Sequence, residues 1–474
     1  MHVNVSFDSS VTGASGAPAG FVDAVNYVAN LYGSIFTNNV TITIAVGFGN
    51  VGNQTVGGVG ASGLALDQYG TVAYSDLKSA LTSHGVSSGS LPAVGPSGGI
   101  EITVIQARAL GFTTPTPVEG VDGYVGFSNS QLIDYGIATQ TAAGAYSFVG
   151  AVEHEFSEVM GRRSNGPAGP NTVLDLYRYS SSTSGSLTLG GAGDSYFSVD
   201  QSQTHLSDFN TPNPAGTSDY ADWADGSGND AFLARGIPGA TVGLTGTDLS
   251  LMRALGWQTN VIGTGTNLVG SGETDLFAKD SSGALSATLL NSSGIATGTI
   301  ALGSGPLVVN GNTGGVGIYL DHSNVLVGSG GVASITGISN GVSLAAGASL
   351  TLSGRNSNVT GNSSVIGSDF VNVTDLGNSD TVRVGAQSHL ISTGNNLSAL
   401  AGAGSTVTLP GSGDLVTTVS SATITVGGSN NNVNAAGTNS LIAVIGNSNT
   451  IAAGSSSAVA LAGTGNTVTI GASS

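Results

Sequence analysis

Hydrophobic and polar residues follow two different periods in the first half of the chain. Apolar positions recur at helical spacing between residues 19 and 36, and again from about 146 to 160. Apolar and polar residues alternate at 3–7 and 40–46, and residues 124–127 also read as a strand. This mixture of helical and strand patterns predicts an α+β domain.

The second half has a repeating pattern of a different kind. Glycine returns every eight or nine residues, and an aliphatic residue follows most of these glycines five positions later, as Ile451 follows Gly446 and Val468 follows Gly463. A Gly/Asn turn followed by a short strand, repeated in this way, predicts a β-solenoid with one coil per repeat, glycine and asparagine taking the left-handed turn conformation. The repeating glycines are Gly377, Gly385, Gly394, Gly402, Gly411, Gly428, Gly437, Gly446, Gly454, Gly463 and Gly471.

Composition changes sharply near Trp257. Residues 1–258 contain 20 of the 28 acidic residues and both tryptophans, whereas only three aromatic residues follow. A shift of this kind indicates a domain boundary. We therefore expect an α+β domain at 1–258, irregular β-rich coils at 259–376 and the regular all-β solenoid at 377–474.

Charge and composition exclude several classes of protein. The 474-residue chain has 10 basic and 28 acidic residues, a net charge of −18 and two lysines, Lys78 and Lys279, so a nucleic-acid partner is not expected. With 39% hydrophobic residues, general disorder is not expected either. Cysteine is absent, which excludes disulfides and thiolate metal sites, and no apolar run approaches the roughly 20 residues of a membrane span.

The N-terminus has neither the basic region nor the apolar region of a cleavable signal peptide. A cysteine-free, acidic, glycine-rich chain of this kind resembles bacterial proteins exported through one-step channels that recognise an uncleaved C-terminus. The expected location is therefore extracellular or at the cell surface, with a cytosolic protein as the alternative.

The second helical stretch contains the sequence His154-Glu155-Phe-Ser-Glu158-Val-Met-Gly161. In the zinc-hydrolase motif H-E-x-x-H, two ligands one helical turn apart face one metal, and the glutamate acts as general base on the bound water. Here Glu158 stands in the place of the second histidine, and a carboxylate is also a zinc ligand. Gly161 matches the glycine that ends the helix in the longer motif, whereas Ser164 occupies the third-ligand position.

This segment resembles secreted bacterial zincin-like metalloproteases that carry the motif H-E-[IV]-[ST]-E-V-[ML]-G-R. The resemblance covers roughly residues 3–257 and extends to an ordered set of other segments, at 7–11, 175–179, 196–200, 219–223 and 247–257. It implies a zincin fold with a closing helix near Thr247, zinc bound by His154 and Glu158, Glu155 as general base, and a protein or peptide substrate.

Several assignments remain open in the sequence. Asp175 and His205 are the candidates for the third zinc ligand, and Tyr177 or Tyr179 for stabilising the oxyanion. Glu158 also has a simpler explanation, an ion pair with Arg162 four residues later.

Acidic residues suggest two further sites with simpler alternatives. The aspartates Asp219, Asp222, Asp225 and Asp230 are interpreted as a solvated acidic loop, with a calcium loop as the alternative. The solenoid repeats distantly resemble the calcium-binding pattern G-G-x-G-x-D-x-U-x. However, only Asp380 and Asp414 supply an acid in the turn, so asparagines hydrogen-bonding along the solenoid axis are favoured over calcium.

The leading hypothesis is an exported, zinc-dependent metallopeptidase domain carried on a β-solenoid. One rival is a catalytically degenerate adhesin or matrix protein with the same fold, and another is a purely structural repeat protein whose first domain caps the solenoid. A third ligand converging on His154 and Glu158 beside an open cleft would favour the enzyme, whereas Arg162 at that point would favour the adhesin. The oligomeric state is left undetermined.

Overall fold

A computed structural model of the chain describes most of its 474 residues. The described part excludes residues 14–15, 52–53, 57–69, 115–119, 130–131, 138–140, 168, 182–184, 191–192, 212–218, 226, 228, 267, 269–273, 310–315, 346, 354–356, 362–363, 368–370, 377 and 472–474.

The chain forms two compact units. The N-terminal unit comprises Met1–Thr264 and Gly272–Ala301, and the solenoid unit comprises Gly265–Ser271 and Leu302–Ser474. Within the described residues, no helix has both the length and the apolar character needed to cross a membrane.

The N-terminal unit mixes helices with short strands. Its helices are α1 (Ser9–Thr12), α2 (Phe21–Ile35), α3 (Tyr74–Ser83), α4 (Val104–Ala109), α5 (Phe148–Val159) and α6 (Gly246–Ala254), with 3-10 turns at Ser88–Ser90 and Leu174–Tyr177. Its strands are β1 (His2–Phe7), β2 (Thr41–Phe48), β3 (Asn50–Val51), β4 (Gln54–Thr55), β5 (Gly70–Val72), β6 (Ile100–Ile102), β7 (Gly123–Phe127), β8 (Ile133–Asp134), β9 (Tyr146–Ser147), β10 (Arg178–Ser180), β11 (Ser195–Phe197), β12 (Ser207–Asp208), β13 (Val261–Thr266), β14 (Thr274–Lys279), β15 (Leu285–Leu290) and β16 (Ala296–Gly303).

A parallel sheet and two helices form the core of this unit. The sheet has the order β1-β2-β7, and α2 and α5 pack together beside it. Phe21 of α2 contacts Phe127 of β7 with ring centroids 5.8 Å apart and Phe148 of α5 at 4.7 Å. The helices expected at 19–36 and 146–160 are thus α2 and α5, and the three expected strands are β1, β2 and β7.

The closing helix α6 begins slightly earlier than the resemblance implied. Its N-cap is Thr245, not Thr247, because Thr245 and Asp248 exchange side-chain and backbone hydrogen bonds in a capping box. Trp257, just beyond the helix, is buried and donates from Nε1 to the Met160 carbonyl at 2.9 Å. This bond fixes the end of the motif helix α5 against the closing segment.

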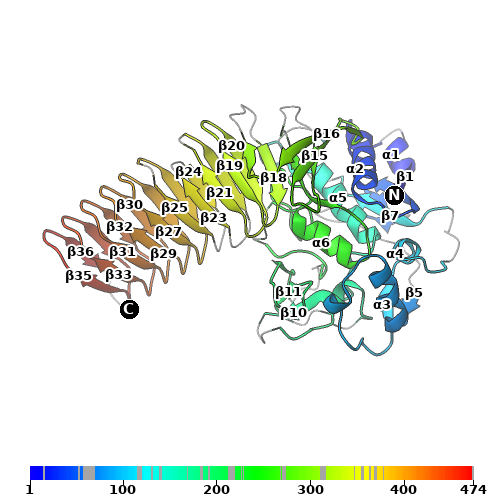
Figure 1. Cartoon of the computed structure of the whole chain (residues 1–474), viewed down its shortest axis with the longest axis horizontal. Coiled ribbons are helices and arrows are strands. Elements are labelled where there is room, and N and C mark those ends of the chain that lie inside the picture. The colour runs from blue at the N-terminus through cyan, green and yellow to red at the C-terminus, as the bar shows by residue number, and fades with distance from the viewer. Residues whose placement is uncertain are drawn as a thin grey trace. The chain divides into compact units, whose positions relative to one another are not determined.

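The solenoid unit is an all-β solenoid, as the glycine repeat predicts. Its strands stack into two parallel sheets, seen in Figure 1 as successive arrows running to the C-terminus. One sheet contains β18 (Val316–Leu320), β20 (Val332–Thr336), β22 (Ser349–Ser353), β24 (Ser364–Gly367), β26 (Thr381–Val384), β28 (Ser398–Ala401), β30 (Leu415–Thr418), β32 (Asn432–Ala435), β34 (Thr450–Ala453) and β36 (Thr467–Ile470). The other contains β17 (Leu307–Val309), β19 (Asn324–Val327), β21 (Gly341–Leu344), β23 (Asn358–Gly361), β25 (Asn372–Asp375), β27 (His389–Ser392), β29 (Thr406–Leu409), β31 (Thr423–Val426), β33 (Leu441–Val444) and β35 (Ala458–Leu461).

Each coil contains two glycine repeats rather than one. Val382 lies beside Ala399 and Ala399 beside Val416, so the coil advances by 17 residues, the separation also seen in the inter-coil hydrogen bonds. Consecutive repeats therefore belong to opposite sheets, and their aliphatic residues face each other across the narrow core. Parallel pairing begins at Leu307, well before the glycine spacing becomes regular.

The repeating glycines have a different role from the one expected. A β-carbon at Gly428 would lie 1.6 Å from the carbonyl oxygen of Gly411, one coil earlier, so the stacked backbones leave no room for a side chain. The left-handed conformation lies two residues later, at Asn430 (φ 59°) and Ser448 (φ 56°). The expected left-handed conformation is thus found at turn asparagines, and among the repeating glycines at Gly463 (φ 120°).

Asparagines in the turns form a ladder along the solenoid, as proposed from the sequence. The backbone N–H of Asn431 donates to Asn449 Oδ1 at 2.8 Å, and that of Asn449 donates to Asn466 Oδ1 at 2.8 Å. Asp414 continues the ladder, because its N–H donates to Asn431 Oδ1 and its Oδ1 accepts from Leu397 N–H. These side-chain oxygens satisfy buried amides of neighbouring coils.

The ladder leads to a stability prediction. Asn431→Ala should destabilise the solenoid by roughly 1–3 kcal/mol, since it leaves the buried Asp414 N–H without an acceptor. The matched control is Asn432→Ala, because Asn432 is exposed on β32 and its loss should change stability by less than about 0.5 kcal/mol. Urea unfolding followed by circular dichroism measures both, and equal effects would contradict the role of the ladder.

Candidate metal centre

Helix α5 carries three residues of the motif and is fixed by packing at its first turns. The Ser147 side chain caps it by accepting from Gly150 N–H at 3.2 Å. Phe148, Val152 and Phe156 are fully buried at helical spacing, which anchors one face of the helix in the core. His154 and Glu158, four residues apart, lie together on a face turned away from this apolar stripe.

The chain reverses direction immediately after this helix. Gly161 has φ +108°, a conformation that favours glycine, and a β-carbon there would lie 2.8 Å from the Gln106 side chain. The next residue folds back along the helix, and Arg162 N–H donates to the Ser157 carbonyl at 3.1 Å. The glycine of the motif thereby returns Arg162 to the face that carries His154.

Three potential ligand atoms converge at this face. His154 Nε2 lies 3.3 Å from Glu158 Oε1 and 3.2 Å from Asp222 Oδ1, and ligand atoms of all three residues lie within 4.8 Å of one another. His154 Nδ1 lies 2.9 Å from the Ala231 carbonyl oxygen, which can only accept a hydrogen bond. Nδ1 therefore donates, and Nε2 is the nitrogen that faces the carboxylates.

These separations fit the geometry of a zinc site. Zinc bonds of about 2.0–2.2 Å in a tetrahedron place neighbouring ligand atoms about 3.3–3.6 Å apart. The His154–Glu158 and His154–Asp222 separations of 3.3 and 3.2 Å are close to this spacing. The donor set of one imidazole and two carboxylates is also one that zinc accepts.

A guanidinium group contacts the same carboxylates. The Arg162 side chain is fully buried, with Nη1 2.5 Å from Asp222 Oδ1 and Nη2 3.3 Å from Glu158 Oε1. The ion pair with Glu158 that was considered as the simpler explanation is therefore present. The structure combines it with a third potential ligand, Asp222, which contacts both His154 and Arg162.

The mutual electrostatics of the cluster shift its pKa values. Burial by itself would lower the pKa of His154, but Asp222 and Glu158 raise it well above its usual range. Burial likewise works against ionisation of Asp222, yet His154 and Arg162 lower its pKa below the ordinary value. Asp222 is therefore held as a carboxylate, the form that ligates metal.

Glu155 is the general-base candidate and lies beside this charge cluster. It is buried, and burial together with the nearby Glu158 carboxylate raises its pKa well above the usual value. Among the described residues, no group donates a hydrogen bond to Glu155 Oε2, although this atom is buried. A buried carboxyl oxygen without a protein partner is suited to a water molecule or a proton in transfer.

Neither expected third ligand joins the cluster. Asp175 is buried elsewhere, where it accepts hydrogen bonds from Ser164 Oγ at 2.7 Å and from Thr172 N–H at 2.9 Å. His205 stacks on Tyr196 and pairs with Asp208 at 2.7 Å. Both side chains thus stabilise local structure within the N-terminal unit.

The two tyrosines considered for oxyanion stabilisation are also engaged elsewhere. Tyr177 is fully buried and donates from its hydroxyl to the Ala254 carbonyl at 3.1 Å. Tyr179 packs its ring against Tyr196, with centroids 6.2 Å apart. Their positions give no support to that role.

The third residue of the cluster, Asp222, had been assigned to a solvated acidic loop. Two members of that group fit the description: Asp219 is exposed, and Asp225 is 60% exposed and pairs with Arg235. Asp222 and Asp230 are buried. The signal that could have identified Asp222 is its place between apolar residues, immediately before the buried Trp223.

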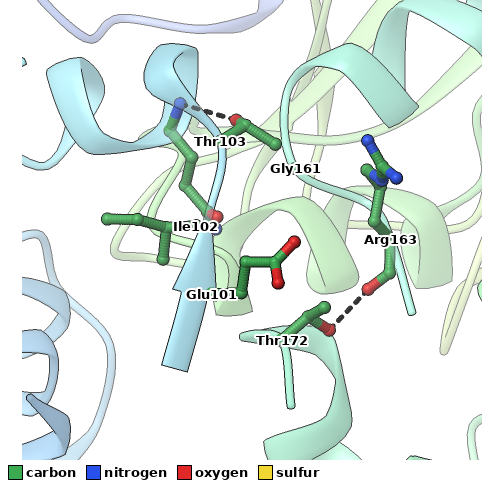
Figure 2. A pocket seen from close by; sticks show the side chains of 7 residues that line it. Glu101, Ile102, Thr103, Gly161, Arg163 and Thr172 are labelled. Atoms are coloured by element: carbon green, nitrogen blue, oxygen red, sulfur yellow. Dashed lines mark hydrogen bonds between the residues drawn. The ribbon is translucent and has the colours of Figure 1, made fainter. Parts of the chain in front are cut away.

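A small pocket lies near the end of the motif helix but outside the cluster. Figure 2 shows it between Glu101, Thr103 and Gly161, with Thr172 Oγ1 donating to the Arg163 carbonyl at 2.6 Å. It has room for about one water molecule, and none of His154, Glu158 and Asp222 lines it.

Comparison with known proteins covers only the end of the chain. A family model described as a protein of unknown function, DUF3060, matches residues 426–474, which include β32 to β36 of the solenoid unit. Curated proteins and solved structures give no significant match. The comparisons therefore carry no information about the cluster on α5.

Proposed function

We propose that the N-terminal unit is a zincin-like, zinc-dependent metallopeptidase domain in which His154, Glu158 and Asp222 ligate the metal. The observation that carries this proposal is the convergence of His154, Glu158 and Asp222, whose ligand atoms all lie within 4.8 Å of one another, with the motif glutamate buried nearby. The site residues proposed from the sequence are retained, and Asp222 takes the place of the third ligand.

Each protein group has a defined task in this proposal. Bound zinc would activate a water molecule for attack on a peptide carbonyl. Glu155 would accept the proton of that water in its ionised form, which the positive charge of a bound metal would favour against the protonated form that burial favours. The Ala231 carbonyl holds His154 Nδ1 and so keeps Nε2 directed at the ligand position.

The proposed substrate is a protein or peptide, and the proposed location is outside the cell or at its surface. A charge of −18 and the absence of cysteine agree with an exported bacterial protein. The solenoid unit would serve as a scaffold for secretion, display or substrate contact. In the turns of the solenoid unit, asparagine and serine oxygens already accept hydrogen bonds from backbone N–H groups of neighbouring coils. These turns need no calcium to satisfy those groups.

One observation favours a second candidate function. The Arg162 guanidinium pairs with both Glu158 and Asp222, so these carboxylates have a counter-ion without metal. A protein in which this pairing is permanent would be a non-catalytic adhesin or structural repeat protein of the same fold. The two candidates differ in whether the cluster takes up zinc.

Zinc affinity of loop variants tests the ligand assignment. We expect Asp222→Asn to weaken zinc binding at least about 100-fold, since loss of even an outer partner of a metal ligand costs 10- to 100-fold. Asp225→Asn is the matched control, because Asp225 is exposed in the same loop and pairs with Arg235. Competition with a chromophoric chelator measures both, and an unchanged affinity in Asp222→Asn would exclude Asp222 as a ligand.

A further inference from the structure

Arg162 contacts both carboxylates of the cluster, as His154 of α5 also does. Its guanidinium is completely buried and lies over the Phe232 ring, 4.5 Å from the centroid. A buried arginine in this position is always charged. The cluster therefore contains a permanent positive charge, whether or not metal is present.

The remaining hydrogen bonds of Arg162 connect the two segments that carry the ligands. On the side of α5, Nε donates to Ser157 Oγ at 2.7 Å and Nη2 donates to the His154 carbonyl at 3.4 Å. On the other side, Nη1 donates to the carbonyl of Ala221, the residue before Asp222, at 3.2 Å. The side chain thus joins the motif helix to the loop that supplies the third ligand.

We propose that Arg162 is a positioning residue that acts as an internal counter-cation, holding Glu158 and Asp222 in ligand geometry before any metal arrives. The inference rests on the proposed zinc site. Its consequence is that the N-terminal unit folds without metal, unlike small zinc domains whose folding depends on the ion. Zinc is then taken up into a site that already exists.

The physical basis is the cost of burying carboxylates without a partner. Removing one member of a buried ion pair is strongly destabilising, because the remaining charge is left uncompensated. If Arg162 is replaced, His154 remains as the one basic partner that the structure shows for two carboxylates, and a bound metal ion would supply the missing positive charge. Stability should then depend on zinc in the variant much more than in the parent protein.

The experiment measures the unfolding temperature of the full chain with excess chelator and with zinc. Trp223 and Trp257, both in the N-terminal unit, report its unfolding by fluorescence. In chelator, Arg162→Met should unfold about 10 °C or more below the parent, and zinc should restore most of this difference. The conservative Arg162→Lys should lose less, since it keeps the charge.

The matched control is Arg163→Met, which removes the neighbouring arginine and should leave the zinc dependence as in the parent. In a parent protein that binds zinc, an arginine with a purely structural role would give Arg162→Met the same loss with and without zinc, and this result would overturn the inference. An unchanged unfolding temperature in chelator would overturn it as well.

A second variant covers the case in which Arg162→Met does not fold. Adding Asp222→Asn removes one uncompensated charge, so the double variant should be more stable in chelator than Arg162→Met alone. A double variant that is no more stable would overturn the counter-cation role. This comparison is made without zinc, so it tests the counter-cation role even in a parent protein that binds no zinc. A more stable double variant in such a protein would support the counter-cation role and exclude only the proposed zinc site.

Discussion

In Glu155→Gln, peptide hydrolysis should fall by at least about 100-fold while zinc remains bound. General-base catalysis contributes typically 10²- to 10⁴-fold, and glutamine cannot accept the proton of the attacking water. The metal should be retained because Glu155 is not among the three converging ligand residues. The measurement is cleavage of a quenched fluorescent peptide library, with zinc content determined on the same samples.

Glu153→Gln is the matched control for this variant. Glu153 lies one position before His154 on α5, and burial followed by the nearby Asp230 raises its pKa to about 8. At neutral pH the side chain is therefore mostly protonated, and glutamine closely imitates it. Hydrolysis at the parental rate in Glu155→Gln would remove the general-base assignment, whereas a zinc-loaded parent that cleaves no peptide would favour the adhesin.

In the solenoid unit, Ile424→Asp should abolish cooperative folding of the coils around β31. Ile424 is fully buried between the two sheets, and an aspartate there would be an unpaired charge in an apolar core. Each coil is stabilised by its neighbours, so the defect should spread to adjacent coils. Circular dichroism should show a loss of β signal and a lower unfolding temperature.

The control for this variant lies on the same strand. Thr423 points outward and is exposed, so Thr423→Asp introduces the same charge without burying it and should change stability by less than about 0.5 kcal/mol. Equal unfolding in the two variants, or a native-like Ile424→Asp, would contradict the assignment of Ile424 to the core.

The sequence predicted the solenoid because its stabilising contacts repeat locally. A glycine followed five residues later by an aliphatic residue is enough to indicate a turn and an inward-facing strand position, as at Gly446 and Ile451. The number of repeats per coil was wrong, since repeat length does not reveal which sheet a strand joins. That information lies in pairing across 17 residues, for example between Val382 and Ala399.

The candidate site was only half visible in the sequence, for a similar reason. His154 and Glu158 lie four residues apart in one helix, so spacing alone places them on one face, and Glu155, three residues before Glu158, lies at the side of that face. Asp222 reaches them from a distant loop, and its position depends on burial of that loop and on its contact with Arg162. The spacing of residues along the sequence does not reveal such a tertiary contact. Asp175 and His205 were therefore equally reasonable candidates for the third zinc ligand.

Binding of zinc by His154, Glu158 and Asp222 can be observed in crystals of the full chain grown with zinc, with diffraction recorded at the zinc absorption edge. We expect one anomalous peak about 2.0–2.2 Å from His154 Nε2 and from a carboxylate oxygen of each acid. Absence of a peak at this position, with Arg162 paired to both carboxylates, would contradict zinc binding and leave a protein that works by binding rather than catalysis.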